Sequence, residues 1–310
     1  MISVVVIGKN EGGRIDECMN SIHHALGVLA HEIVYVDSRS TDDSVARAKA
    51  HGVRCYRLEE PNTTAGLGRL VGTQVAKGEY LLFLDGDMAL QPGFCEKAMM
   101  AMAAHDYAGC TGVRKDVYMK NGQVVGTNDN YFGCTQERVA PEFGGALFIK
   151  REALEKAGGW SADTIACEEA ELHARLRACG CVIAELPVPM IVHTDAVRDG
   201  RGALGVIFSH RRLGEGQALR CAMARHQGST YIRHENEKFL FYSLDWMCVI
   251  LMLLLGVWGV LGALFFQMAQ LGNLIARRRV RAFVSQKLFF FAFPAGLLTY
   301  RVRSRAYSEA

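Results

Sequence analysis

The sequence carries almost no net charge. Its 35 lysines and arginines face 32 aspartates and glutamates, which leaves a formal charge of +3 at pH 7. Chains that bind nucleic acid usually carry a clear excess of basic residues, so we expect no nucleic-acid partner. Basic residues do gather after Ala276, where a single acid, Glu309, stands against Arg277, Arg278, Arg279, Arg281, Lys287, Arg301, Arg303 and Arg305.

Cysteine pairs with the spacing of a metal or redox site are absent. The ten cysteines contain no Cys-x-x-Cys pair, and the single residue between Cys179 and Cys181 is poor spacing for a zinc site. Residues 1–24 do not have the pattern of a secretory signal. We therefore expect reduced thiols in a domain that faces the cytosol.

Charged residues are also missing from residues 246–266. A helix needs about 20 apolar residues to cross the hydrocarbon core of a bilayer, and the alternative is a buried core helix. We expect three regions: an N-terminal domain over residues 1–200, an amphipathic interfacial segment over residues 201–238, and a transmembrane or hairpin anchor with a basic tail over residues 239–310. The expected location is the inner (cytoplasmic) membrane.

The basic cluster after Ala276 constrains how this region meets the membrane. A single crossing would place the cluster on the side opposite the N-terminal domain, against the tendency of basic residues to stay in the cytosol. Two arrangements return it to the cytosol, where it can meet anionic lipid heads. One is a hairpin over residues 239–276 that turns within residues 256–262, and the other is a return through residues 288–298.

Strand and helix patterns alternate through the first part of the chain. Apolar, β-branched runs predict buried strands, and apolar residues at helical spacing predict the helices between them. The expected strands are residues 2–7, 33–36, 53–58 and 80–84, and the expected helices are residues 15–26, 45–50 and 65–76. This alternation predicts an α/β, Rossmann-like domain with a mostly parallel central sheet.

The fourth strand ends in two carboxylates, Asp85 and Asp87, on either side of Gly86. Ligands of an open α/β sheet bind beyond the carboxyl ends of its strands. Two neighbouring carboxylates repel each other unless a cation joins them, and Mg²⁺ or Mn²⁺ bound to a diphosphate suits such a pair. The alternative is a plain turn, since Asp and Gly are common turn residues.

Polar residues also follow the other expected strands. Asn10 and Glu11 come after the first strand and Asp37 ends the second. Because the carboxyl ends of parallel strands lie along one edge of a sheet, these side chains and the two aspartates form one candidate site.

Five segments in order resemble motifs of the inverting family-two glycosyltransferases with the A-type fold. They are residues 3–11, 35–42 (Tyr-Val-Asp-Ser-Arg-Ser-Thr-Asp), 79–87 (Glu-Tyr-Leu-Leu-Phe-Leu-Asp-Gly-Asp), 144–160 (Gly-Gly through Gly-Gly-Trp) and 168–177 (Glu-Glu-Ala-Glu-Leu through two arginines). The resemblance covers about the first 200 residues. It implies the A-type fold and transfer of a sugar from a nucleotide donor with inversion of configuration.

The resemblance also assigns roles on the donor side. Asp37 would hold the uracil or ribose, and Asp85 the ribose or a metal-bound water. Asp87 would ligate Mn²⁺ or Mg²⁺ on the diphosphate, with His193 as a further metal ligand. Arg69 would face the diphosphate, although Leu70 replaces the asparagine that the family often has next to that arginine.

The catalytic base is where the sequence departs from the family. The family usually has aspartate as the second acid of its Glu-Asp pair, and this chain has Glu169 there, after Glu168. The resemblance makes Glu169 the base, with Glu168 as the second candidate. A general base needs only hydrogen-bond reach to the acceptor hydroxyl, which a longer side chain can also give.

The expected reaction is transfer of a sugar, a hexose, from a UDP-sugar to a lipid-linked or glycan acceptor in the assembly of cell-surface glycans. A sugar nucleotidyltransferase is one alternative, but it does not explain the acidic helix start or the apolar C-terminal region. Another is a membrane-bound subunit that binds the nucleotide sugar without catalysis, which the glutamate at position 169 suggests.

Overall fold

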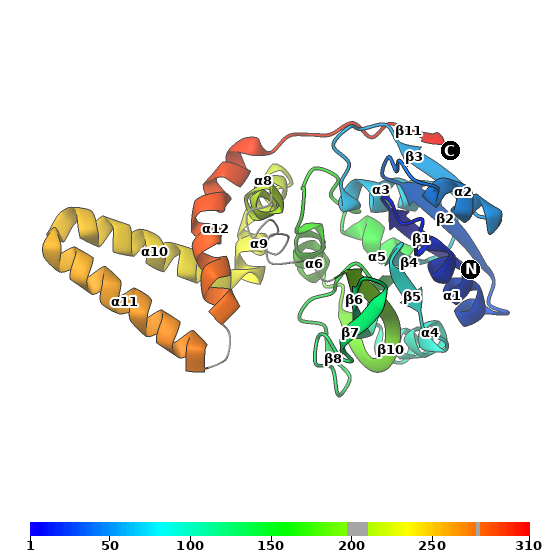
Figure 1. Cartoon of the computed structure of the whole chain (residues 1–310), viewed down its shortest axis with the longest axis horizontal. Coiled ribbons are helices and arrows are strands. Elements are labelled where there is room, and N and C mark those ends of the chain that lie inside the picture. Colours follow the sequence, from blue (N-terminus) through cyan, green and yellow to red (C-terminus); the bar gives the residue numbers. More distant parts are fainter. Residues whose placement is uncertain (197–209, 277–279) are drawn as a thin grey trace. The chain divides into compact units, whose positions relative to one another are not determined.

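A computed structural model describes residues 1–196, 210–276 and 280–310 of the chain, and the side chains of these except within 273–286. The chain forms two compact units (Figure 1). The first comprises residues Met1–Asp199 together with Arg301–Ala310, and the second is Gly200–Tyr300. Residues 201–209 of the expected amphipathic segment, and the first three arginines of the basic cluster, lie outside the described residues.

The first unit is built on an 11-stranded sheet in the order β11-β3-β2-β1-β4-β9-β6-β10-β5, with β7 paired to β6 and β8 to β10. The strands are β1 (Ile2–Gly8), β2 (His31–Asp37), β3 (Arg54–Leu58), β4 (Tyr80–Asp85), β5 (Met88–Leu90), β6 (Gly109–Lys120), β7 (Gln123–Asn128), β8 (Arg138–Val139), β9 (Leu147–Lys150), β10 (Ile183–Ala196) and β11 (Tyr307–Glu309). A large central sheet in a mixed α/β fold was expected, and the structure confirms it.

The sheet is less parallel than the sequence analysis predicted. The strands β3, β2, β1 and β4 run parallel to one another, as expected. Beyond β4 the sheet is mixed, because β9 lies antiparallel to both β4 and β6. Antiparallel neighbours need no helical crossover, so this half of the sheet lacks the strand–helix alternation from which the parallel order was predicted.

Helices cover both faces of the sheet: α1 (Ile15–Leu26), α2 (Ser44–Ala50), α3 (Ala65–Val75), α4 (Phe94–His105), α5 (Arg151–Lys156) and α6 (Glu168–Ala178). Alternate residues of β1 point to opposite faces. Val4 and Val6 join one apolar cluster with residues of α1 and α4, and Val5 and Ile7 join a second with residues of α3, α5 and α6. The full burial of β1 explains why its sequence is apolar throughout.

The last ten residues do not continue the C-terminal region in which they were expected. Strand β11 pairs antiparallel with β3 at the edge of the sheet. Arg305 forms an ion pair with Asp163 at 2.8 Å, and the backbone N–H of Arg303 donates to the same carboxylate at 2.9 Å. This part of the basic tail is therefore held by an acidic partner within the first unit. The expectation that the tail meets lipid heads stays a prediction.

The second unit is helical. It contains the short helix η1 (His210–Leu213) and then α8 (Gly214–Ala224), α9 (Gly228–His234), α10 (Asn236–Leu255), α11 (Val257–Ala276) and α12 (Val280–Thr299). Helices α10 and α11 form a hairpin that turns at Gly256, whose φ of 53° favours glycine. The charge-free stretch is thus two helices rather than one, as in the first of the two arrangements considered above.

Helix α10 is the single helix of the described residues that is long and apolar enough, by length and composition, to cross a membrane. Only 11% of its most apolar 18-residue window is buried. A core helix of a soluble protein passes the same length test but is mostly buried, so α10 needs another explanation for its exposed apolar surface.

Candidate active site

The candidate site lies at the carboxyl ends of β1 and β4, where the backbone fixes the Asp85-Gly86-Asp87 turn. The N–H of Gly86 donates to the carbonyl of Ile7 at 2.8 Å, and the carbonyl of Asp87 accepts from the N–H of Thr194 at 3.2 Å. A side chain at Gly86 would meet Glu11, since an added Cβ would lie 3.1 Å from its Cγ. The turn therefore sits between β1 and β10, with both aspartates at its ends.

Arg69 is the centre of this site. Its guanidinium donates to Asp85 Oδ1 at 2.9 Å, to Glu168 Oε1 at 2.9 Å and to Glu169 Oε1 at 3.1 Å, and it lies 4.9 Å from the ring centre of Trp160. The side chain is 1% exposed. Arg69 was expected to face a diphosphate, and the structure instead gives it three carboxylate partners that join the end of β4 to the start of α6.

Glycines in α3 allow the side chain of Arg69 to be buried between this helix and its neighbours. A Cβ at Gly66 would lie 1.9 Å from the carbonyl oxygen of Ser161, and one at Gly72 would lie 2.2 Å from Cγ1 of Val5. Helix α3 can approach β1 and the segment before α6 only because these positions lack side chains. Thr64 caps the helix by accepting the N–H of Leu67 at 3.1 Å.

The two candidate bases differ in access to solvent. The side chain of Glu168 is 5% exposed and that of Glu169 is 25% exposed, although both contact the same nitrogen of Arg69. Burial, together with the neighbouring Glu169, raises the pKa of Glu168 to about 7 against the opposing effect of Arg69. Of the two, only Glu169 presents a carboxylate that an incoming hydroxyl can approach.

The raised pKa of Glu168 predicts a pH-dependent effect of the Glu168→Gln variant. A carboxyl whose pKa is higher in the folded than in the unfolded state stabilises the fold while protonated, and this contribution is lost as the pH rises from about 4.5 to about 7. Glutamine does not titrate, so the variant does not lose this stability as the pH rises. The difference in free energy of unfolding, variant minus parent protein, should therefore increase by on the order of 3 kcal/mol from pH 5 to pH 8. Urea titrations at both pH values measure it, and a difference that does not change with pH would contradict the assignment.

Asp87 pairs with His193 on the neighbouring strand. His193 Nε2 lies 3.4 Å from Asp87 Oδ2, while Nδ1 lies 3.2 Å from Asp116 Oδ1 and 2.9 Å from Arg114 Nη2. Burial alone would lower the pKa of His193, but the contact with Asp87 outweighs it and raises the pKa. Burial would raise the pKa of Asp87, and His193 and Arg14 lower it instead.

A divalent cation fits these residues. Asp87 Oδ1 is buried and has no hydrogen-bond partner among the described residues. The pKa of the neighbouring Glu11 is raised to about 7, first by burial and then by the charge of Asp87, against the effect of Arg14. Within the described residues no three His, Cys, Asp or Glu side chains form a complete metal cage. Mg²⁺ needs only one or two protein carboxylates when phosphate oxygens supply other ligands, so Asp87, with His193 beside it, is compatible with such an ion.

The expected nucleotide-binding residues lie around the loop after β2. Asp37 is fully buried, and its two oxygens accept the N–H of Ser40 at 3.2 and 3.0 Å. Asn10 has a left-handed φ of 60°, and its Oδ1 accepts the N–H of Thr41 at 2.8 Å. In the structure Asp37 and Asn10 shape the loop, and because Asp37 is fully buried, its contact with a uracil or ribose requires the surrounding loop to move.

Two arginines of the site escaped the sequence analysis. Arg14 lies 3.3 Å from Glu11 and 3.8 Å from Asp87, and Arg114 donates to Asp116 at 2.6 Å while touching His193. Arg114 also lies 4.6 Å from the ring centre of Tyr131. The sequence did contain a signal for Arg14, because it lies three positions after Glu11 and a basic residue at that spacing can pair with the acid. Arg114 had none, because the contact that brings it to the site is with His193 on the distant β10.

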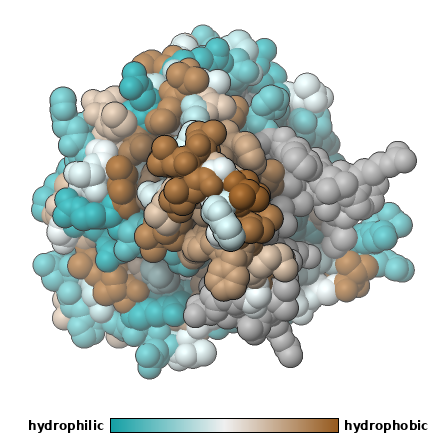
Figure 2. Space-filling model, turned by 90° about the vertical axis from the view of Figure 1, so that its left-hand side faces the viewer, coloured by the Kyte–Doolittle hydropathy of each residue, from teal (hydrophilic) through white to brown (hydrophobic). Residues whose placement is uncertain are grey.

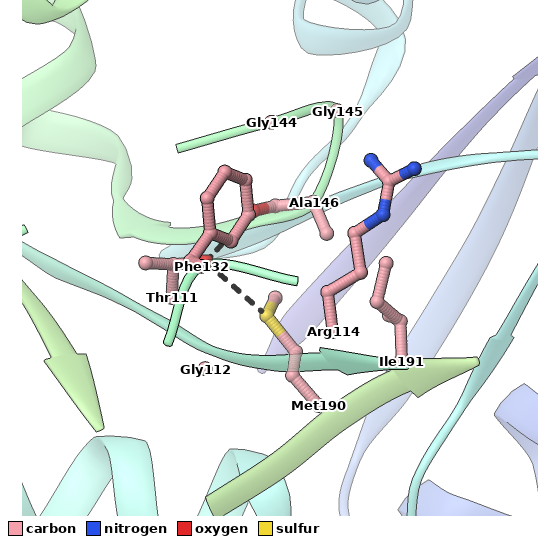
Figure 3. A pocket seen from close by; sticks show the side chains of 9 residues that line it. All are labelled: Thr111, Gly112, Arg114, Phe132, Gly144, Gly145, Ala146, Met190 and Ile191. Atoms are coloured by element: carbon pink, nitrogen blue, oxygen red, sulfur yellow. Dashed lines mark hydrogen bonds between the residues drawn. The ribbon is translucent and has the colours of Figure 1, made fainter. Parts of the chain in front are cut away.

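The expected acceptor-side segment contributes Gly145. A Cβ there would lie 2.5 Å from Asp85 Oδ2 and 2.8 Å from Arg69 Nη2, so only glycine leaves these two groups in place. Beside it a cavity of about 10 Å³ lies between β6, β10 and the loop before β9 (Figure 3). Thr111 closes its inner side by donating to the carbonyl of Ala146 at 3.3 Å. A space of this size holds about one water molecule and is a packing gap, not a sugar pocket.

Comparisons with known proteins agree with this geometry. The model of the family described as glycosyl transferase family 2 matches residues 3–158. The uncharacterized glycosyltransferase YibD of Escherichia coli K12 is 34% identical over 108 residues, and the glucosyl-3-phosphoglycerate synthase of Mycobacterium tuberculosis is 33% identical over 93. These alignments cover 34% and 28% of this chain, and 31% and 29% of the two relatives, so they span less than a third of each relative.

Among solved structures, residues 1–349 of Staphylococcus aureus TarS in complex with UDP-GlcNAc have a similar fold. The TM-score is 0.59 at 18% sequence identity, and the superposition covers 96% of this chain and 90% of that one. The likeness extends over the fold as a whole, while the family model matches half of the sequence, including β1, β4 and the Asp85-Gly86-Asp87 turn. The resemblance read from the sequence motifs is confirmed, and this chain belongs to glycosyl transferase family 2.

Proposed function

We propose that the protein is an inverting glycosyltransferase that moves a hexose from a UDP-sugar to a hydroxyl group of a lipid-linked acceptor in cell-surface glycan assembly. The proposal rests mainly on the hydrogen bonds of Arg69. Its guanidinium donates both to Asp85, the carboxylate on the donor side, and to Glu169, the candidate base, so these two groups lie close together. The solved complex of TarS with UDP-GlcNAc, a protein of similar fold, supports a uridine nucleotide donor.

In this proposal the sugar is transferred by a single displacement. The acceptor oxygen bonds to the anomeric carbon as the bond from that carbon to the diphosphate breaks, and the electron pair leaves with the nucleoside diphosphate. Glu169 takes the acceptor proton. Arg69 holds Glu169 and Asp85 in place, so their separation is set before substrate binds. A divalent cation bound by Asp87 and His193 would offset the charge that develops on the leaving group.

The membrane part of the proposal rests on α10 and α11. Their exposed apolar side chains, which reach 80% exposure at Leu253 and 77% at Phe265, suit association with the cytoplasmic face of the inner membrane. A site held there would meet a polyprenyl-phosphate- or polyprenyl-diphosphate-linked sugar. Equal transfer by the purified protein to a soluble acceptor would refute the lipid-linked acceptor while leaving glycosyl transfer intact.

The Asp87→Asn variant tests the donor side. Purified full-length protein is screened against nucleotide sugars for release of the nucleoside diphosphate, with Mn²⁺ or Mg²⁺ and with a chelator. We expect release to need the cation and to fall about 10²-fold in the variant, because a neutral amide holds the cation poorly. The matched control is Asp129→Asn, the same change at a residue that is 74% exposed, which should keep its activity.

Two other outcomes would contradict the proposal. Nucleotide-sugar binding without any release, in the presence of either cation and a lipid-linked acceptor, would identify a binding subunit without catalysis. Formation of a sugar nucleotide from a sugar phosphate and a nucleoside triphosphate would identify a nucleotidyltransferase.

A further inference from the structure

The hairpin of α10 and α11 presents apolar side chains to its surroundings. Figure 2 looks onto the turn between the two helices and shows hydrophobic residues gathered there. The large apolar side chains of the hairpin that are at least half exposed are Leu240, Ile250, Leu253, Leu254, Leu255, Val257, Trp258, Leu261, Leu264, Phe265 and Met268. A surface of this kind is costly in water and requires an apolar partner.

The distribution of these side chains indicates lipid as the partner. At about 100° per residue, the exposed apolar positions of α10 spread over more than half of its circumference. A protein groove covers one side of a helix, whereas lipid chains surround it. Backbone groups in the interior of the two helices are paired with one another, as the hydrocarbon core demands, and at the turn the N–H of Val260 donates to the carbonyl of Gly256 at 3.1 Å.

The contact between the two helices is of a kind that suits a bilayer. A Cβ at Gly259 would lie 2.0 Å from the carbonyl oxygen of Leu251, so α11 packs directly on the backbone of α10 at this point. Ala263, one turn further, is 7% exposed. Helices that pack in lipid use such small residues four positions apart to bring their backbones together.

A polar cluster sets the depth to which the hairpin can enter. Asp245 of α10 forms an ion pair with Lys287 of α12 at 2.5 Å and accepts from Gln267 of α11 at 3.0 Å, and it is 5% exposed. Ten residues separate Asp245 from the end of α10 at Leu255, which is about 15 Å of helix. The hydrocarbon core of a bilayer is about 30 Å thick, so this arm matches one leaflet.

We propose that the α10–α11 hairpin inserts into one leaflet only, with its turn at Gly256 near the bilayer midplane and the Asp245–Lys287 pair at the level of the lipid head groups. The proposal rests on the membrane association proposed above and specifies its form. Tyr242 and Trp246, whose ring centres are 6.5 Å apart, lie beside the pair, where aromatic residues favour the interface.

Two full crossings fit the structure less well. If α10 crossed the whole bilayer, Asp245, at the tenth of its 20 residues, would lie near the midplane together with Lys287. Charged groups there are costly even when they are paired. Insertion into one leaflet avoids this cost. It also leaves both ends of the hairpin on one side of the membrane.

Tryptophan fluorescence tests the depth. The chain has three tryptophans, and Trp160 is 1% exposed in the first unit, so Trp246→Phe reports mainly on Trp258, and Trp258→Phe mainly on Trp246. Each full-length variant is reconstituted in phosphatidylcholine–phosphatidylglycerol vesicles whose acyl chains carry bromine either near the carbonyl or near the methyl end. Bromine near the methyl end should quench Trp258 more strongly, and bromine near the carbonyl should quench Trp246 more strongly.

Stronger quenching of Trp258 by bromine near the carbonyl would place the turn at the opposite surface and overturn the one-leaflet arrangement. Absence of quenching from either position would show that the hairpin contacts protein instead of lipid, and would refute the membrane association as well. Phenylalanine keeps the aromatic character at both positions, and circular dichroism checks that each variant is folded. Neither outcome depends on turnover, so loss of the proposed transferase activity remains a separate result.

Discussion

The Glu169→Gln variant should lose about 10²–10⁴-fold in kcat, the range expected when a general base is removed, while its affinity for the nucleotide sugar stays close to that of the parent protein. Glutamine has nearly the shape of glutamate and can still accept the hydrogen bond from Arg69, which now joins Glu169 at 3.1 Å. What it cannot do is take a proton from the acceptor hydroxyl. Turnover is measured as sugar transfer at saturating donor, and donor affinity by calorimetry.

Two further variants make this result specific. Glu155→Gln, the same change at a side chain that is 63% exposed on α5, should leave kcat unchanged. Glu168→Gln should retain more activity than Glu169→Gln, since Glu168 is almost fully buried beneath the guanidinium. The reverse order, with Glu168→Gln the more damaged enzyme, would transfer the role of base to Glu168.

Replacement of Arg69 by glutamine should remove both activity and stability. Asp85, Glu168 and Glu169 would lose their shared cation in a place where Arg69 itself is 1% exposed. Removing one partner from a buried ion pair costs about 3–5 kcal/mol, because the remaining charge stays buried and unpaired. We expect a decrease of that size in the free energy of unfolding, measured by urea titration, and no measurable transfer at temperatures where the variant is still folded.

Arg175→Gln is the matched control for this variant. Arg175 is as deeply buried as Arg69, and it pairs with Glu171 at 2.7 Å within the same helix that carries Glu168 and Glu169. Its loss should reduce stability by a similar amount but leave the three carboxylates on Arg69. If both variants lost activity in proportion to their stability, Arg69 would have a structural role only.

Much of the catalytic unit could be predicted because its signals are local. The strands β1 and β4 are continuous apolar runs, and the turn of the β6–β7 hairpin falls at Asn121 and Gly122, a local turn pair whose φ values are 52° and 77°. The gathering of Asp85, Asp87 and Glu11 followed from the rule that parallel strands end at one edge. These features require no knowledge of distant contacts.

What escaped prediction depends on partners far apart in the sequence. The burial of Arg69 requires α3 to approach Ser161 through Gly66, and glycines within a helix also occur for other reasons. The mixed order of β9, β6 and β10 depends on which strands meet, and short apolar runs do not specify direction. Strand β11 has three residues in a polar, basic context, so its pattern favoured a tail. In each case the stabilising contact joins residues that are far apart in the chain, and such a contact produces no periodic pattern in the sequence.

The pairing of β11 with β3 gives the chain an unusual connectivity. Because the polypeptide returns to the catalytic sheet after Tyr300, the helical unit is an insertion with two covalent connections and not an appendage at one end. Cutting the gene after residue 200 would therefore delete an edge strand and the arginines that hold Asp163. To produce the first unit alone, residues 200–300 have to be excised and the two flanks joined through a linker, so that both segments of the unit remain in one chain.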